Sequence, residues 1–334
     1  MLRLPPFDFR NARSAAEAVD LWGESEGRAM FVAGGTDLIP NMKRRQFEPP
    51  VLVGIRRLEG GRDLQTDDGL ELGAGVTLRQ LAAAPNVRES YPGLAEAAGQ
   101  VANLQIQRVG TIGGNLCVDT RCNYYNQTYE WRRSVGFCMK KDGDICLVAP
   151  GSSKCWAISS SDSAPILMAL GATVDVLGTD GPRTISLGDM YQDDGIEYLT
   201  LKPGELMTAV RVPAPGNGQR STYVKVRRRG SFDFPILGVG ASLRIEDGRV
   251  RDARLVLGAV HTHPLAVTGV SELMEGETPT LELCEAAAEL AYKRATPLDN
   301  ADLVYYWRKQ VTRVHVRRAL ARLCGLEVAP GGVR

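Results

Sequence analysis

The chain has 334 residues, 44% of them hydrophobic, and a formal net charge of +1. This length predicts two or three domains with well-packed cores, and the near-neutral charge argues against nucleic acid as the main partner. No apolar run approaches the ~18 residues of a membrane span, the N-terminal residues lack an apolar signal segment, and the seven cysteines do not suit a fully paired disulfide framework. We therefore expect a cytoplasmic protein with reduced thiols and without a membrane partner.

The first elements predict a small βαβ unit, because helical and strand-like patterns alternate. Ser14 and Glu17 form a capping box that begins a helix. The elements expected after this helix are a strand over residues 29–33, a short helix over residues 37–44 and a strand over residues 51–55.

The middle of the chain mixes strands and helices. Thr77 and Gln80 form a second capping box, which begins a helix that ends near Ala84. The other expected helices cover residues 93–99 and 164–170. The expected strands cover residues 70–76, 172–177, 183–186 and 206–212.

The segment 213–218, rich in proline and glycine, is the best candidate for a domain boundary. After it we expect antiparallel strands over residues 222–228, 239–246 and 253–259, with Asp247 and Gly248 as a hairpin turn, and helices over residues 281–294 and 302–323. Residues 330–332 are expected to be disordered. The predicted domains are residues 1–55, residues 56–215 with an insert at about 117–158, and residues 216–334.

Two glycine pairs stand out, Gly34-Gly35 and Gly113-Gly114, and each follows an apolar run that resembles a strand. Most such pairs are ordinary turns. Glycine also lets the backbone approach a ligand closely, and Thr36 or Asp37 is a candidate cap for a helix whose free N–H groups face an anion. Two such turns suit the two phosphates of one dinucleotide, although neither pair has the G-x-G-x-x-G spacing of a Rossmann fold.

Three motifs carry a resemblance to a known family: Ala33-Gly34-Gly35-Thr36-Asp37-Leu38, Thr111-Ile112-Gly113-Gly114-Asn115 and Ser161-Asp162-Ser163-Ala164-Pro165. They resemble the FAD-binding subunit of the molybdenum hydroxylases, which include xanthine dehydrogenases, aldehyde oxidoreductases and carbon monoxide dehydrogenases. The resemblance implies an α/β plus α+β protein, with two FAD-binding subdomains and a C-terminal domain of antiparallel sheet and helices.

The same resemblance implies which residues contact FAD. The implied FAD-binding residues are Val32, Ala33, Gly34, Gly35, Thr36, Asp37, Leu38, Thr111, Gly113, Gly114, Asn115, Asp162, Leu206 and Lys225, with Asp233 near the FAD as well. Three of them also have simple structural explanations: Asp162 as a helix N-cap, Leu206 as a core residue and Lys225 as an exposed strand lysine. The resemblance assigns no catalytic residue to this chain.

An insert separates the second and third motifs, since Asn115 and Ser161 stand 46 positions apart, and five of the seven cysteines fall within it. Residue spacing alone leaves four explanations open for these five cysteines. They are packing of free thiols, disulfides, structural zinc and an iron–sulfur cluster.

The insert resembles the [4Fe–4S] insert of the β subunits of 4-hydroxybenzoyl-CoA reductases, and a related insert occurs in some bacterial aldehyde oxidoreductases. This resemblance implies that Cys122, Cys138, Cys146 and Cys155 are cluster ligands and leaves Cys117 out. It further implies a subunit that passes electrons between this cluster, FAD and the [2Fe–2S] clusters of a small partner subunit, beside a molybdopterin-binding large subunit. It also implies that ferredoxin is the electron donor and that the complete enzyme is a dimer of heterotrimers.

The substrate chemistry implied by this resemblance takes place on a partner subunit and is the reductive dehydroxylation of 4-hydroxybenzoyl-CoA to benzoyl-CoA. The alternatives are the FAD subunit of an aldehyde oxidoreductase or a xanthine dehydrogenase-like enzyme, a self-contained flavin dehydrogenase, and a zinc-stapled interaction subunit without redox activity.

Overall fold

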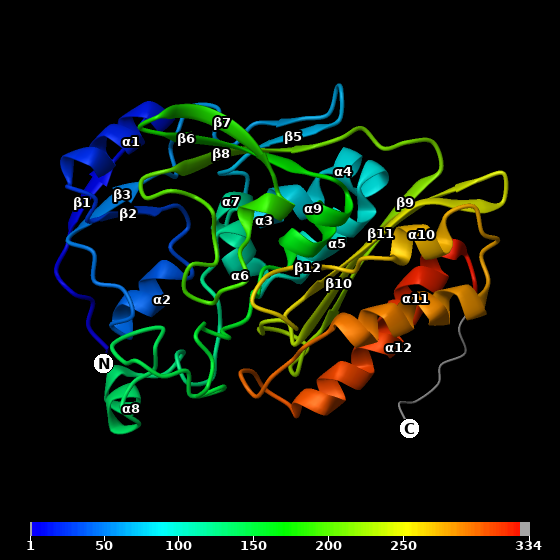
Figure 1. Cartoon of the computed structure of the whole chain (residues 1–334). Coiled ribbons are helices and arrows are strands. Elements are labelled where there is room, and N and C mark those ends of the chain that lie inside the picture. Colours follow the sequence, from blue (N-terminus) through cyan, green and yellow to red (C-terminus); the bar gives the residue numbers. More distant parts are fainter. Residues whose placement is uncertain (1, 328–334) are drawn as a thin grey trace.

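Three β-sheets organise the chain in a computed structural model that describes residues 2–327 (Figure 1). Residues 330–332, predicted to be disordered, lie outside the described residues. Within the described part, no helix combines the length and the apolar character needed to cross a membrane.

The first sheet has the strand order β1-β3-β2, and all its strands are parallel. Its strands are β1 (Asp8–Asn11), β2 (Ala29–Val32) and β3 (Val51–Gly54), and its helices are α1 (Ala15–Glu24) and α2 (Leu38–Lys43). Ser14 caps α1 by accepting a hydrogen bond from the Glu17 N–H at 3.1 Å. The predicted βαβ unit is therefore confirmed, and β1 is an addition to it.

The second sheet has the order β4-β5-β8-β6-β7 and is antiparallel. Its strands are β4 (Leu64–Gln65), β5 (Leu70–Gly73), β6 (Thr173–Gly178), β7 (Gly181–Ser186) and β8 (Leu206–Val212). The helices and the 3-10 turn η1 that accompany it are α3 (Leu78–Ala83), α4 (Pro85–Ser90), α5 (Pro92–Gln100), α6 (Leu104–Gln107), α7 (Ile112–Leu116), α9 (Ser163–Ala169) and η1 (Gly188–Met190). The capping box of Thr77 and Gln80 at the start of α3 is confirmed.

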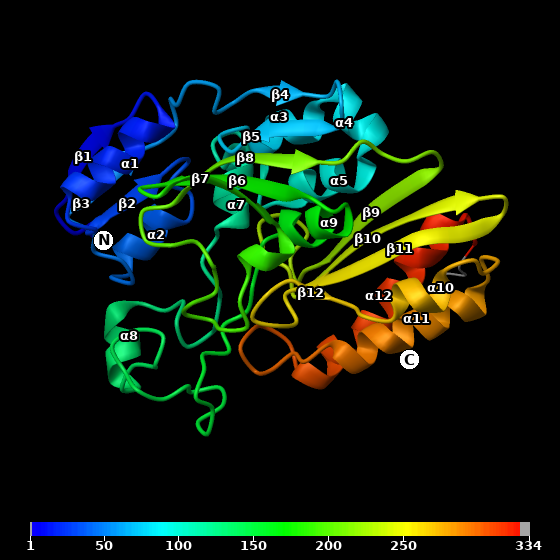
Figure 2. The ribbon, with the colours of Figure 1, turned by 45° about the horizontal axis from the view of Figure 1, so that its top comes forward.

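The third sheet is antiparallel with the order β12-β11-β10-β9. Its elements are β9 (Gln219–Val226), β10 (Leu237–Glu246), β11 (Arg249–Gly258), β12 (Leu265–Ala266), α10 (Val270–Met274), α11 (Leu281–Arg294) and α12 (Tyr305–Cys324). Asp247 and Gly248 both have positive φ and form the predicted hairpin turn between β10 and β11. Figure 2 shows α11 and α12 on the outer side of this sheet, while α5 and α9 pack on β9 and β10 from the side of the second sheet.

The insert folds into loops and one short helix, α8 (Tyr129–Ser134), around a small core of its own. It lies below α2 in Figure 1 and is held there by long-range hydrogen bonds. Arg132 donates to the Arg44 carbonyl at 3.0 Å, and Gln46 donates to the Tyr125 carbonyl at 2.6 Å. The insert is thus a folded unit attached to the N-terminal sheet and not a free loop.

Candidate cofactor sites

The first glycine pair forms the turn between β2 and α2. Gly35 has a φ of +68°, which favours glycine, and a Cβ on Gly34 would collide with the carbonyl oxygen of Val109. The backbone N–H groups of residues 34–38 have no hydrogen-bond partner among the described residues. A turn with consecutive free N–H groups is a concave binding site for an anion such as a phosphate.

The expectation that Thr36 or Asp37 caps α2 is wrong. Asp37 occupies the N-cap position, but its side chain makes no capping hydrogen bond. Its carboxylate instead forms an ion pair with Arg121 and accepts a hydrogen bond from the Asn41 amide at 3.0 Å. Because Arg121 belongs to the insert, this ion pair joins the insert to the first glycine turn.

The second glycine pair also differs from the prediction, because it lies inside the short helix α7 and not at the end of a strand. Thr111 is the N-cap, and its hydroxyl accepts from the Gly114 N–H at 3.1 Å. The N–H groups of Ile112 and Gly113 are used by the Val76 and Ala74 carbonyls. Three of this turn's amides are thus already bonded within the protein, which leaves the first turn as the better anion site.

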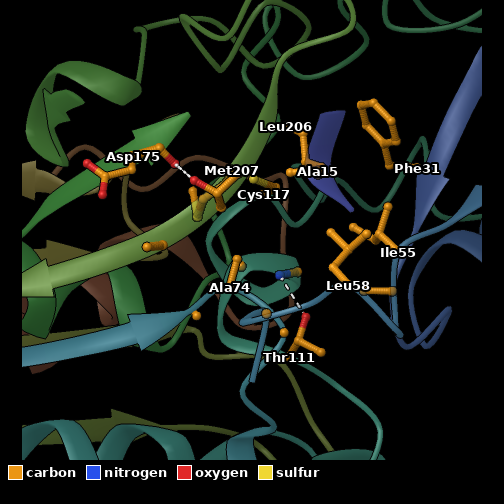
Figure 3. A pocket seen from close by; sticks show the side chains of 18 of the residues that line it. Ala15, Phe31, Ile55, Leu58, Ala74, Thr111, Cys117, Asp175, Leu206 and Met207 are labelled. Atoms are coloured by element: carbon orange, nitrogen blue, oxygen red, sulfur yellow. Dashed lines mark hydrogen bonds between the residues drawn. The ribbon is translucent and has the colours of Figure 1, made fainter. Parts of the chain in front are cut away.

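The two turns meet in an elongated cleft made of two adjoining cavities, of about 670 Å³ and about 270 Å³. Both cavities include Ala33, Thr111, Gly114 and Cys117 in their walls. Figure 3 shows the larger cavity, with Phe31, Ile55 and Leu58 to one side and Leu206 and Met207 above Ala74 and Thr111. The combined space matches the size of a small-molecule site.

Most of the predicted FAD residues lie in this cleft. Those in its wall are Val32, Ala33, Gly34, Gly35, Thr36, Asp37, Leu38, Thr111, Gly113, Gly114, Asn115 and Leu206. Asp233 is absent from the described lining and instead accepts hydrogen bonds from the Arg229 backbone and side chain.

Sequence reasoning missed several residues of the cleft. Gly60 and Gly61 line the larger cavity. They are a third glycine pair, and the same pattern that marked the other two pairs as candidate binding turns would have marked this one. Phe232 and Phe234 line the smaller cavity and remain about half exposed, at 48% and 47%. The Arg121 guanidinium lies 4.4 Å from the centre of the Phe234 ring, so a loop of the C-terminal region covers this end of the cleft.

Asp162 and Lys225, which were also predicted to contact FAD, do not appear in the described lining of either cavity. The Lys225 ammonium donates to Asp162 at 2.8 Å and to the Gln100 carbonyl at 3.0 Å, and its side chain is 0% exposed. Tyr223 donates to the other Asp162 oxygen at 2.7 Å. Burial raises the pKa of Asp162, while the Lys225 charge and the hydrogen bonds from Lys225 and Tyr223 oppose that rise.

One of the simple structural explanations is therefore wrong, and another holds only for the position of the residue. Lys225 is buried and not an exposed strand lysine, and Asp162 occupies the N-cap position of α9 without a capping hydrogen bond. Ser161 takes over that capping role, since its hydroxyl accepts from the Ala164 N–H at 3.1 Å. The same hydroxyl donates to Asn115 Oδ1 at 2.9 Å, so these residues fix the orientation of the Asn115 amide at the edge of the cleft.

Replacing Lys225 by methionine should lower the free energy of unfolding by about 3–5 kcal/mol, because it leaves the Asp162 carboxylate buried without its counter-ion. Urea denaturation of the flavin-free chain, followed by circular dichroism, measures this. The control is Lys202→Met, which removes an ion pair with Asp180 whose side chains are 62% and 74% exposed and should leave stability nearly unchanged. Equal effects of the two substitutions would contradict a structural role for the buried pair.

The four cysteines assigned to a cluster come together in the structure. Cys122, Cys138, Cys146 and Cys155 are buried and line one small cavity, together with Tyr124, Tyr125, Met139, Lys140, Leu147, Val148 and Ala157. Cys117 is absent from this described lining and lies in the wall of the cleft instead. We call the cavity that these four cysteines line the cysteine pocket.

The cysteine pocket is apolar enough to disfavour free thiolates. Burial raises the pKa of Cys122 to about 12 and that of Cys155 to about 11. One of the four sulfurs, that of Cys155, accepts a hydrogen bond from the Ala157 N–H at 3.4 Å. A bound metal ion or cluster would convert the four thiols to thiolates and release their protons. Four thiols are the donor set of either an iron–sulfur cluster or zinc. Among the described residues, no three of these sulfur atoms form a group within 4.8 Å of one another, which is wider than the shell around a single zinc ion.

A second group of potential ligands lies near Trp156. Asp193, His261 and His263 place their ligand atoms within 4.8 Å of one another. The Lys154 ammonium already binds the Asp193 carboxylate at 2.5 Å, and Thr262 donates to it at 2.6 Å. Burial and the neighbouring His263 lower the pKa of His261 to about 4. This carboxylate is therefore neutralised by a lysine, and the group forms an ion-paired polar cluster beside the insert.

Comparison with known proteins agrees with this geometry. Residues 5–215 match the family described as the FAD binding domain in molybdopterin dehydrogenase, and residues 221–323 match the CO dehydrogenase flavoprotein C-terminal domain. The FAD-binding subunit PaoB of the Escherichia coli aldehyde oxidoreductase is 33% identical over 84% of this chain and 90% of its own length.

Carbon monoxide dehydrogenases provide the other comparisons. The medium chain of the Afipia carboxidovorans enzyme is 28% identical over 95% of this chain and 96% of its own length. The solved structure of the Hydrogenophaga pseudoflava enzyme has a TM-score of 0.79 at 25% identity and covers 95% of this chain and 97% of its own. From these matches and the glycine-lined cleft, the chain belongs to the family of FAD-binding medium subunits of the molybdenum hydroxylases.

Proposed function

We propose that the chain is the electron-transfer flavoprotein subunit of a molybdenum enzyme, with FAD in the cleft and a [4Fe–4S] cluster in the cysteine pocket. One observation carries the cluster: four cysteines from widely separated positions line a single buried cavity, in a segment that packs against the wall of the cleft. A free loop with thiols buried one by one would not produce this arrangement.

The proposed cofactors divide the chain's residues between two tasks. The free N–H groups of residues 34–38 hold the pyrophosphate of FAD, and the apolar wall around Phe31, Ile55 and Leu206 covers one of its ring systems. Cys122, Cys138, Cys146 and Cys155 hold the cluster. When bound, FAD supplies electron exchange in ones or twos, and the cluster supplies single-electron exchange.

Substrate chemistry belongs to partner subunits in this proposal. The assembly comprises this chain, a molybdopterin-binding large subunit and a small subunit with two [2Fe–2S] clusters, arranged as a dimer of heterotrimers. The similarity to the aldehyde oxidoreductase subunit of Escherichia coli, at 33% identity, favours an aldehyde-oxidising assembly as the first candidate. The resemblance of the insert favours reductive dehydroxylation of 4-hydroxybenzoyl-CoA, with ferredoxin as donor, as the second.

Anaerobic titration of the complete assembly distinguishes these candidates. In an aldehyde-oxidising enzyme, benzaldehyde added to the oxidised assembly should bleach the visible flavin absorption. In the reductase, 4-hydroxybenzoyl-CoA added to the chemically reduced assembly should restore that absorption and yield benzoyl-CoA. Turnover of either compound by this chain alone would contradict the proposal, because it would make the chain a self-contained flavin enzyme.

A further inference from the structure

Lys140 is a buried cation in the wall between the cysteine pocket and the cleft. Its side chain is 6% exposed, and its ammonium donates to Asp119 at 2.8 Å, to the Thr120 hydroxyl at 2.7 Å and to the Gly195 carbonyl at 2.6 Å. Three acceptors use all three donors of an ammonium, so the charge is held in one place. The Asp119 side chain is equally buried, at 6%.

The ion pair has a defined orientation relative to the two sites. Lys140 lines the cysteine pocket, while Asp119 lines the smaller cavity of the cleft. The cation of the pair therefore belongs to a residue in the wall of the cysteine pocket, and the anion belongs to a residue in the wall of the dinucleotide site. Charges act strongly on neighbouring groups in such an interior, because little water is present to screen them.

Two aromatic rings extend the same wall. The Lys140 ammonium lies 4.8 Å from the centre of the Tyr125 ring and 5.5 Å from that of Tyr198. Tyr125 lines the cysteine pocket and Tyr198 lines the smaller cavity of the cleft. Lys140 and its contacts thus span the partition between the two sites.

We infer that Lys140 and Asp119 set the difference in reduction potential between the group in the cysteine pocket and the flavin. Lys140 raises the potential of the group in the cysteine pocket, and Asp119 lowers the potential of the flavin. This inference rests on the proposed function. Reduction adds negative charge, which a nearby cation stabilises and a nearby anion opposes. Lys140 and Asp119 are positioning residues, since they act on the potentials and not on a substrate.

Spectroelectrochemical titration of the anaerobic assembly tests the inference with three variants. Lys140→Gln keeps hydrogen-bonding capacity but removes the charge, and we expect it to make reduction in the cysteine pocket about tenfold less favourable, which is about 59 mV for a one-electron couple. Lys140→Arg keeps the charge and should leave that potential close to the wild-type value. Asp119→Asn should raise the flavin potential, a shift opposite in sign.

The outcomes separate this inference from the proposed function. A wild-type assembly with no iron beyond that of the small subunit's [2Fe–2S] clusters would overturn both. Normal iron and FAD contents with unchanged potentials in Lys140→Gln and Asp119→Asn would overturn the inference alone. Equal loss of iron in Lys140→Gln and Lys140→Arg would overturn it too, because the lysine would then serve only to hold the insert together.

Discussion

Replacing Gly34 by alanine should weaken FAD binding by about 10- to 100-fold, because overpacking of this kind costs about 1–3 kcal/mol. The added Cβ would collide with the Val109 carbonyl, just before the second glycine motif. The first turn must then move away from α7, and the cleft between them loses its shape. Flavin released by denaturation, measured per polypeptide, reports the effect.

Gly23→Ala is the matched control for this substitution. Gly23 lies in α1, and a Cβ there would meet no atom within 4 Å. We expect this variant to retain its FAD and to gain about 0.5–1 kcal/mol in stability, since alanine favours the helix more than glycine does. Normal FAD content in the Gly34→Ala variant would show that the two glycine turns do not form the binding site together.

Serine in place of Cys138 or Cys146 should reduce the iron in excess of the partner's [2Fe–2S] clusters from about four atoms per chain to nearly none, because a cubane cluster needs all four thiolates. FAD should remain, since neither cysteine is among the described residues that line the cleft. Iron, sulfide and flavin analysis of anaerobically purified protein gives all three quantities from one sample.

Cys117→Ser provides the control for the ligand set. Cys117 belongs to the wall of the cleft and is not among the described residues of the cysteine pocket. Its substitution should preserve iron, with at most a change in flavin content. Loss of iron from Cys117→Ser together with full iron in Cys146→Ser would show that the ligands were assigned wrongly. Zinc in place of iron in the wild type would identify the pocket as a structural zinc site.

Local signals in the sequence were sufficient for much of the fold. The capping box at Thr77 and the turn at Asp247 and Gly248 each depend on neighbouring residues, and both are confirmed. The box at Ser14 is confirmed only in part, because Ser14 caps the helix but Glu17 accepts from the Arg13 N–H and not from the Ser14 N–H. The bounds of α11, Leu281–Arg294, also agree with the prediction. Strand β1 escaped detection because its four residues are exposed and show no apolar alternation.

The contacts that shape the sites depend on residues far apart in the chain, and local patterns do not encode them. Asp37 matches a capping pattern, yet its partner is Arg121 in the insert. Lys225 has the pattern of a surface lysine on a strand, yet β9 packs on α5 and buries it beside Asp162. Only the folded chain brings these charges together.

The cysteines of the insert show what spacing, resemblance and structure each contribute to assigning ligands. Spacing alone left packing, disulfides, zinc and a cluster open for the insert, and resemblance selected four ligands. The structure brings those four side chains to one cavity and leaves Cys117 in the cleft. Their role as cluster ligands stays a prediction, since thiols that line one cavity bind either iron or zinc.

The most direct test of this account is the cofactor content of the wild-type assembly, purified without oxygen. Protein, flavin, iron and acid-labile sulfide should be quantified in the same sample, after allowance for the [2Fe–2S] clusters of the small subunit. The account predicts about one FAD for each copy of this chain, together with about four iron and four sulfide in excess of those clusters. A preparation that lacks flavin, or lacks this excess of iron and sulfide, would contradict it.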